Sequence, residues 1–297
     1  MKKTRSGLQT TTRIFGLLAV MVTCTTFMCC GPATNLRHLH SAKQNAVIVP
    51  LFGQVTQDWY PSLYQAFADT RTDVVIAWME SGGGSVTEVR LLDRKIKVLR
   101  AAFPAKSFYT FSEYLIASGA YWLACTADSI FLAPTAYCGS IGVIYTRIDS
   151  TRADSIAGVK YHIIHAGNNK AFGNSHYPIT LPEVYSAGQE ILNIYNIFLE
   201  TVLHSRGERL LAAYDTLGVV VPFETYILYL EQGDVFGAEE SKAFGLADEV
   251  LWFDGLIQHL SRRGLKVSNV NGLPVSSFHN MSNSLVHKPR EIYLEIK

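Results

Sequence analysis

The sequence has no excess of charge of either sign. Its 297 residues include 26 lysines and arginines against 25 aspartates and glutamates, and no basic stripe stands out. Proteins that bind nucleic acid usually carry such a stripe to neutralise phosphates. The balance therefore argues against nucleic acid as a partner, while the length is sufficient for one large domain with a substantial core.

Cysteine is scarce, and its spacing gives no support to a metal site. Three of the five cysteines lie in or at the end of an N-terminal apolar segment, and the sequence contains no CxxC or Cys/His ligand spacing. We therefore expect neither a metal nor a cofactor. Two interpretations stay open for Cys125 and Cys138. They pair in an oxidising compartment, or Cys125 packs as a small hydrophobic side chain on its helix.

Nucleotide-binding glycine motifs are also missing. A triple glycine, Gly82-Gly83-Gly84, follows a predicted strand, but neither GxxxxGK[ST] nor GxGxxG is present. A tight strand-to-helix turn accounts for the glycines in either case. Because such a turn lets the backbone approach a ligand closely, Gly83 or Gly84 is suited to donate its N–H to a substrate carbonyl oxygen. The pattern favours acyl transfer over phosphate binding.

One long uncharged run is present, at residues 14–30 (IFGLLAVMVTCTTFMCC). A full membrane span needs about 20 apolar residues, so residues 1–30 are predicted to be a signal peptide or a short anchor. Four cations precede the run and Arg37 and Lys43 follow it, which places the N-terminus in the cytoplasm. We expect a protein of the cell (inner) membrane with its catalytic domain on the extracytoplasmic side. A buried core helix is the alternative, and lipidation of Cys29 or Cys30 fits the preceding residues poorly.

After a polar tether at residues 31–45, short apolar strands alternate with helices up to residue 263. This alternation predicts an α/β domain at 46–263 with a mainly parallel sheet, followed by a polar tail at 264–297. The predicted strands are 46–50, 74–79, 107–111, 129–132 and 235–236. The predicted helices are 60–68, 86–101, one beginning at Ser118, 181 to about 206, 222–231, 238–244 and 253–263.

The candidate chemistry lies in the segment 114–143 (YLIASGAYWLACTADSIFLAPTAYCGSIGV). Ser118 and Gly119 form a turn before an apolar run of helical proportions. A serine at the mouth of a buried helix lies beside unpaired backbone N–H groups, as a nucleophile next to an oxyanion site requires. A simple N-cap is the alternative role. Ser140 brings a second hydroxyl into a glycine-flanked bend.

Four blocks are informative as a set: ESGGGSV (80–86), ASGAYWLACTADSIFLAPTAYCGSIGV (117–143), HAGNNKAFGN (165–174) and QGDVFGAEESKAFGLADEV (232–250). In this order they resemble the signal peptide peptidase A (SppA) family of serine proteases. The resemblance covers roughly residues 46–252. It implies the ClpP/crotonase-like fold, a spiral of βα units. The residues AGNNKAFGN resemble phage-type head-maturation members of the family more than its housekeeping members. The N-terminal membrane segment, in contrast, favours a housekeeping member.

Carried over by position, the resemblance implies Ser118 as the nucleophile and Lys170, in AGNNK, as the general base. Ser140 matches the hydroxyl that steadies the lysine amine. The N–H groups of the glycine turn and of Gly119 are implied to form the oxyanion hole.

Two positions depart from the family pattern. Gly82 replaces the usual proline, which leaves open whether Gly83 or Gly84 donates. Ala120 replaces a commoner glycine, a change that a helix tolerates.

A lysine base makes a physical demand. A free lysine has a pKa of about 10.4, so acting near pH 7 requires a depression of roughly three units, or about 4 kcal/mol. Burial against apolar groups can supply this, with Phe172 as one candidate. The plain alternative is a solvated loop lysine. A second alternative is a Ser-His-Asp arrangement using His162 or His165 and Asp128, for which no spacing argues.

Members of this family act as ring- or dome-shaped oligomers, and in forms with one motif set serine and lysine meet across a subunit boundary. This chain has one such set, so the resemblance implies a homo-oligomer. We expect a membrane-associated serine endopeptidase with a Ser-Lys dyad, acting on hydrophobic peptides such as cleaved signal peptides. The alternatives are a phage-like scaffold- or capsid-processing protease, and a non-catalytic membrane-anchored scaffold.

Overall fold

The structure, a computed structural model, describes residues 45–269. The predicted signal or anchor segment and nearly all of the tether lie outside this range, as do residues 270–297. Within the described range, no helix combines the length and the apolar character that crossing a membrane requires.

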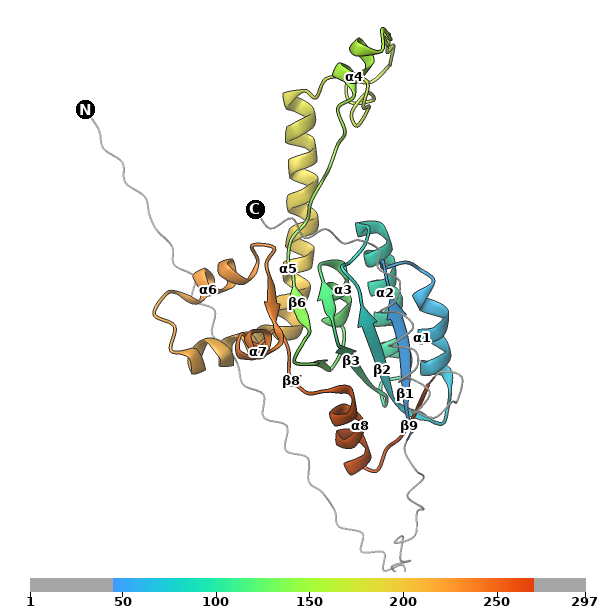
Figure 1. Ribbon diagram of the computed structural model, residues 1–297, viewed down its shortest axis with the longest axis vertical. Helices are drawn as coiled ribbons and strands as arrows, with labels where there is room; N and C mark the ends of the chain where they lie inside the picture. Colours follow the sequence, from blue (N-terminus) through green and yellow to red (C-terminus); the bar gives the residue numbers. More distant parts are fainter. Residues whose placement is uncertain (1–44, 270–297) are drawn as a thin grey trace, which may run out of the picture. The chain divides into compact units, whose positions relative to one another are not determined.

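A six-stranded parallel sheet forms the centre, in the order β8-β5-β3-β2-β1-β9 (Figure 1). This confirms the predicted α/β architecture with a mainly parallel sheet, and it fits a ClpP-like fold. The strands are β1 Asn45–Phe52, β2 Thr72–Glu80, β3 Ser107–Ser112, β5 Ser129–Leu132, β8 Glu249–Val250 and β9 Lys266–Asn269.

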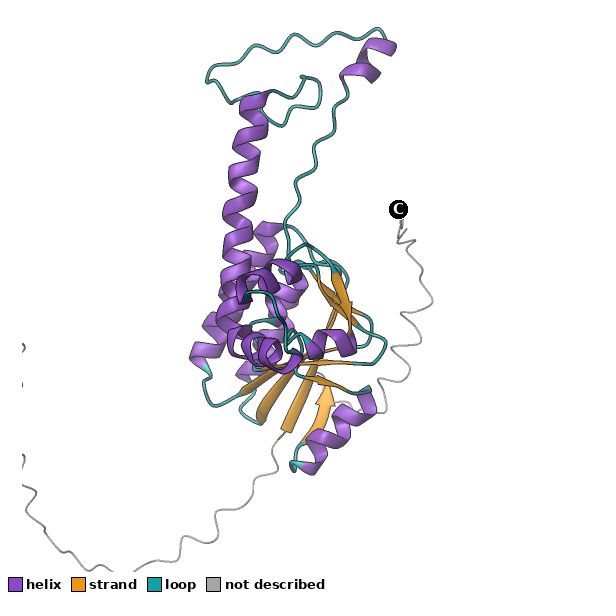
Figure 2. Ribbon diagram, turned by 90° about the vertical axis from the view of Figure 1, so that its left-hand side faces the viewer, coloured by secondary structure: helices purple, strands orange, loops and turns teal. Residues whose placement is uncertain are grey.

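Both faces of this sheet are buried, as parallel strands joined by helices require. Side chains alternate along each strand: Val47 and Val49 of β1 join one apolar cluster, and Ala46 and Ile48 join the other. The first cluster is covered by most of the helices, and α8 covers the second (Figure 2). The helices are α1 Trp59–Ala68, α2 Val86–Ala102, α3 Gly119–Ala124, α4 Thr151–Ile156, α5 Leu181–Leu217, α6 Phe223–Leu230, α7 Ala238–Ala243 and α8 Phe253–Arg262.

A smaller three-stranded sheet carries the candidate serines. Its strands are β4 Leu115–Ala117, β6 Tyr137–Gly139 and β7 Val235–Gly237, with β6 in the middle. The β4–β6 pair is parallel, and Ala117 lies opposite Gly139. Ser118 and Ser140 therefore leave the same end of two neighbouring strands.

Two local predictions are wrong in their bounds. The helix predicted to end near Arg206 continues as α5 to Leu217 and ends at Gly218 in the left-handed conformation. It continues because Leu210 and Ala213 remain on its buried face. The tail predicted from residue 264 begins instead with β9, since Lys266–Asn269 pair with β1. A strand this short has too little periodicity to stand out in the sequence.

Between β6 and the N-terminal part of α5, the chain forms a projection that we call the arm, residues 145–190. Figures 1 and 2 show this segment rising beside α5, with α4 near the N-terminal end of that helix. Its interior is polar. The Arg147 Nε lies 3.1 Å from Glu183 Oε1, and these side chains are only 5% and 3% exposed.

Candidate active site

The two candidate serines share an uncommon backbone conformation. In the described range, Ser118 (φ 54°) and Ser140 (φ 52°) are the non-glycine residues with positive φ. Such a conformation costs about 1–3 kcal/mol per residue and persists where the surroundings enforce it. The Ser118 N–H donates to Gly139 O at 2.9 Å, and the Ser140 N–H donates to Asp234 O at 2.6 Å. Hydrogen bonds within the small sheet thus hold both serines.

Ser118 is not a side-chain N-cap. It occupies the N-cap position of α3, but its hydroxyl makes no capping hydrogen bond, whereas its carbonyl accepts from Trp122 N at 3.0 Å. The hydroxyl is therefore not consumed by the helix. The alternative capping role considered from the sequence does not describe this residue.

Both serines line one cavity of about 730 Å³. Gly84 and Gly119 line it as well, so the structure brings together four of the six predicted site residues. The remaining wall is largely apolar and comes from α2, α3, α5 and the segment after Ser140. Its apolar members are Val86, Val89, Trp122, Val143, Ile144, Ile191, Leu192, Ile194 and Phe198.

The glycine turn lies directly against the nucleophile position. A Cβ added at Gly83 (φ 105°) would lie 3.0 Å from both Ser118 Cβ and Gly119 N. The Gly83 N–H donates to Ser81 Oγ at 3.1 Å. By contrast, the N–H groups of Gly84 and Gly119 donate to no acceptor within residues 45–269. Two uncommitted donors therefore lie next to Ser118.

Lys170 does not join this cavity in the described chain. It is exposed, in the loop between α4 and α5, and is absent from the cavity wall. The loop around it is nevertheless ordered: Gly173 N donates to Glu183 Oε1 at 2.8 Å, and Arg147 donates to the carbonyls of Asn174 and Tyr177. The single chain presents the lysine on the arm, apart from the serine.

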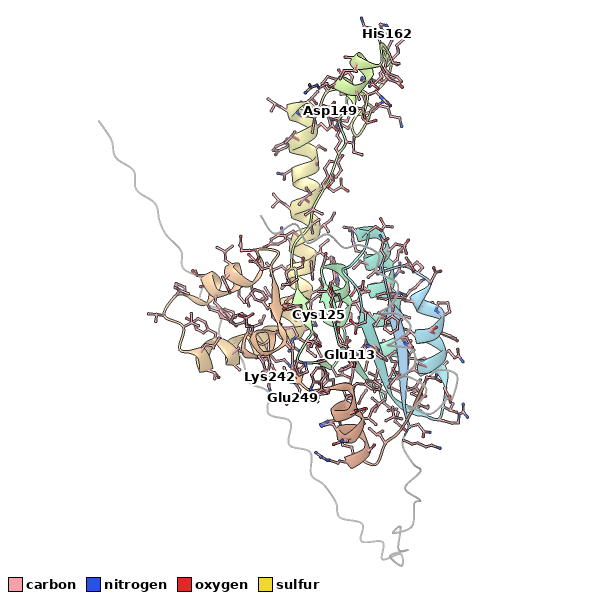
Figure 3. The ribbon with its side chains drawn as sticks, viewed as in Figure 1. Glu113, Cys125, Asp149, His162, Lys242 and Glu249 are labelled. Atoms are coloured by element: carbon pink, nitrogen blue, oxygen red, sulfur yellow. The ribbon has the colours of Figure 1, made fainter. Side chains whose placement is uncertain are left out.

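The histidine alternative gains nothing from the structure. His162 and His165 are exposed on the arm, and of the described residues neither these two nor Asp128 lines the cavity. His165 Nδ1 lies 3.0 Å from Gly167 O, and Asp128 accepts from Phe108 N and Arg100. Figure 3 labels His162 on the arm and Cys125 in the body, which we define as the described residues outside the arm.

The two cysteines of the domain are free thiols, both buried. Burial raises the pKa of Cys125 to about 11 and that of Cys138 to about 12. Of the two interpretations from the sequence, Cys125 takes the second, as a small side chain in the larger apolar cluster. No disulfide joins Cys125 and Cys138 in the structure.

One partly buried carboxylate near the site was not predicted from the sequence. Glu80, at the end of β2, accepts hydrogen bonds from Trp78 Nε1, Ser112 Oγ and three backbone N–H groups at distances of 2.6–3.0 Å. Burial raises its pKa, although these hydrogen bonds oppose the shift. The carboxylate ties the strand before the glycine turn to the segment that leads into Ser118. Its position directly before the turn was the available signal.

Comparison with known proteins agrees with this geometry. Residues 105–215, which include both serines, Lys170 and most of α5, match the sequence model of Peptidase family S49. This part of the chain is similar to an S49 peptidase domain. A putative protease of Methanocaldococcus jannaschii is 28% identical over 59% of this chain and 51% of its own length. Protease 4 of Salmonella typhi is 25% identical over 64% of this chain and 28% of its own length. The S49 match and these protease-named relatives support a serine-type peptidase.

A third relative carries a different name. A Na(+)/H(+) antiporter NhaA of Brucella melitensis is 30% identical over 50% of this chain and 20% of its own length. The chain thus spans between a fifth and about half of the curated relatives that it matches. The part of that antiporter that is similar to this chain makes up only a fifth of its length, so its name says nothing of this chain.

In the described range, no cluster of three or more histidine, cysteine, aspartate or glutamate side chains is arranged to hold a metal ion.

Proposed function

We propose that the chain is a serine endopeptidase in which Ser118 attacks the peptide carbonyl. The observation that carries this proposal is the placement of Ser118. Its hydroxyl is uncapped, its backbone is held at positive φ, and it faces a cavity beside two uncommitted N–H groups. Preorganised donors at a developing oxyanion are among the largest contributions to catalysis of acyl transfer.

We assign the oxyanion donors to Gly84 and Gly119. The N–H of Gly83 already donates to Ser81 Oγ, and Gly83 does not line the cavity, so this glycine serves the turn. Its missing side chain still matters, because any Cβ there would crowd Ser118 and Gly119. The committed N–H of Gly83 supports Gly84, rather than Gly83, as the donor from the glycine turn.

The base is Lys170 of another copy of the chain. In one chain the lysine is exposed on the arm, away from the cavity wall, while the Arg147–Glu183 pair fixes the loop that carries it. The arm also exposes large apolar side chains, among them Ile148 (73%) and Ile164 (96%). Such surface is usually covered in an assembly. Docking of one arm on a neighbour covers this surface and delivers the amine to Ser118.

The reaction follows from these placements. Ser118 Oγ bonds to the carbonyl carbon while its proton passes to the neutral amine of Lys170, and Ser140 hydrogen-bonds this amine. The carbonyl electrons move onto oxygen, where Gly84 and Gly119 donate. The carbon–nitrogen bond then breaks, and the leaving amine takes the proton from Lys170. Water, activated by the same lysine, hydrolyses the acyl-enzyme.

Hydrophobic peptides such as cleaved signal peptides are the proposed substrates, and the N-terminal apolar run is the proposed attachment to the membrane. The support is the apolar wall of the cavity, which suits apolar side chains near the scissile bond, and the uncharged run at 14–30.

Two experiments test the proposal on the assembled, detergent-solubilised protein. A fluorophosphonate should label wild type, and Ser118→Ala should abolish the label. Ser118→Ala and Lys170→Ala should each lose peptide cleavage, by about 10³-fold or more, whereas Lys160→Ala, an exposed lysine of the same arm, should not.

Mixing the two inactive variants provides the sharper result. If the lysine acts across a subunit boundary, mixed assemblies contain intact sites and regain part of the activity. Labelling of Ser118 without any recovery on mixing would show a self-contained site. Absence of label in the intact assembly would contradict the enzyme itself.

A further inference from the structure

The cavity wall contains a carboxylate, that of Glu231, with one unpaired oxygen. Glu231 follows α6, and its N–H donates to Ile227 O at 3.1 Å, so the backbone there is fixed. Its side chain lines the cavity, and its Oε2 atom is buried and accepts no hydrogen bond within residues 45–269. Buried polar atoms are nearly always hydrogen-bonded, so such an atom in a cavity wall points to a missing partner.

A second orphan atom lines the same cavity. The Trp122 side chain, which is 3% exposed and stacks on Phe198, has an Nε1 donor without a described partner. The cavity therefore combines an apolar wall with an unmet acceptor and an unmet donor, which is the make-up of a small-ligand or side-chain pocket.

No cationic side chain of the described residues lines the cavity to pair with Glu231. The titratable side chains on the cavity wall are Tyr195 and Glu231 itself, and no lysine, arginine or histidine of residues 45–269 lines it. Burial, a hydrogen bond to Glu231 and the charge of that carboxylate raise the pKa of Tyr195, so Tyr195 supplies a neutral donor to Glu231 but no positive charge. The pocket is thus left with one acidic group and no counter-charge.

The backbone that follows Glu231 contacts the segment that carries Ser140. The turn after it carries Asp234, whose carbonyl accepts from Ser140 N, and Gly233, whose Cα would lie 3.6 Å from a Cβ built on Gly142. Ser118 N in turn donates to Gly139 O. The backbone next to Glu231 is therefore connected to both serines through the small sheet.

The side chains that suit this pocket are long ones with an apolar stem and a cationic head. Lysine and arginine bury their methylene groups against apolar surface and place the charge on an acceptor. The apolar wall from α2 and α5 fits the stem, and the unpartnered Oε2 of Glu231 fits the head.

We propose that the cavity is a specificity pocket for a lysine or arginine side chain of the peptide substrate, with Glu231 binding its charged head. This inference rests on the proposed peptidase function and refines its substrate class. A signal peptide offers both features, because a cationic n-region precedes its apolar h-region.

The test measures kcat/KM on the assembled enzyme with one peptide scaffold. The residue whose side chain enters the pocket is varied among arginine, lysine, glutamine and norleucine at each position flanking the scissile bond. Wild type should prefer the basic peptides over norleucine at one position. Glu231→Gln should lower kcat/KM for those peptides by about 10- to 100-fold, the value of a charge-assisted hydrogen bond, and leave the norleucine peptide unchanged.

The matched control is Glu224→Gln, an exposed carboxylate on the first turn of α6, which should keep the wild-type preference. Equal cleavage of basic and norleucine peptides by wild type overturns the inference. So does an equal loss on all peptides in Glu231→Gln, which would mean that the carboxylate acts on Lys170 of the neighbouring copy. In both outcomes Ser118 still reacts with fluorophosphonate, whereas absence of label and of all cleavage marks failure of the proposed function.

Discussion

The body and the arm are stabilised in opposite ways. The body buries apolar side chains on both faces of its main sheet, and residues such as Leu63 and Phe108 are fully buried. The arm keeps a buried ion pair at its centre and leaves Ile164 and Leu181 exposed by 96% and 85%. The body therefore has an apolar core of its own, whereas the arm is held by polar contacts and leaves these large apolar side chains exposed.

The largest expected effect comes from breaking the ion pair of the arm. Arg147→Ala leaves the Glu183 carboxylate buried without its partner, which typically costs about 3–5 kcal/mol. The loss should be local. Amide hydrogen exchange should accelerate across residues 145–190, while β1 and β2 keep their protection. Arg152→Ala removes an exposed arginine of the same arm and should change neither region. Parallel loss of protection in β1 and β2 would show that body and arm are one cooperative unit.

The second prediction compares one apolar side chain from each region. Leu63→Ala, in α1, creates a cavity in the larger cluster and should lower the free energy of unfolding by about 2–5 kcal/mol. Ile164→Ala removes a side chain that is 96% exposed. This variant should change the free energy of unfolding by less than about 0.5 kcal/mol in the isolated chain. Urea denaturation at equal protein concentration measures both free energies of unfolding. A similar loss of stability in the two variants would contradict the difference between the body and the arm.

The third and smallest effect concerns the carboxylate that ties the body to the catalytic segment. Glu80→Gln replaces one acceptor oxygen with an amide donor facing backbone N–H groups, and should lower the free energy of unfolding by about 1–3 kcal/mol. Trp78 and Ser112 also donate to this side chain, so peptide cleavage should fall together with stability.

The pH dependence of that variant follows from the raised pKa of Glu80. A carboxyl whose pKa is higher in the folded than in the unfolded state contributes stability that is fully present below the unfolded value. That contribution is lost as the pH rises through the folded value. The difference in stability between wild type and Glu80→Gln should therefore narrow as the pH rises from about 4.5. A difference that widens over this range would contradict the assigned direction of the shift.

Much of the body was predictable because its signals are local. Apolar runs bounded by glycines predicted the strands at 46–50 and 74–79, and 3–4 spacing predicted the helix at 86–101, which the structure extends by only one or two residues at most ends. Helix α4 was not predicted. Asp149, whose Oδ1 accepts from Thr151 N at 2.9 Å, was the signal for its start. The end predicted for α5 near Arg206 was wrong, because buried Arg206 donates to Gly245 O and to Asp248 and holds the helix in place.

By itself the sequence determined the class of the domain, the alternation of strands and helices, and the short segments that hold Ser118, Ser140 and the glycine turn. These features depend on side-chain periodicity and on a few residues close together in the chain. Only the tertiary structure decided that Gly83 has a committed N–H while Gly84 and Gly119 do not, that Glu231 enters the serine cavity, and that Lys170 lies apart on the arm. These facts depend on register between distant strands and on which polar groups find partners once buried, and no local pattern encodes either.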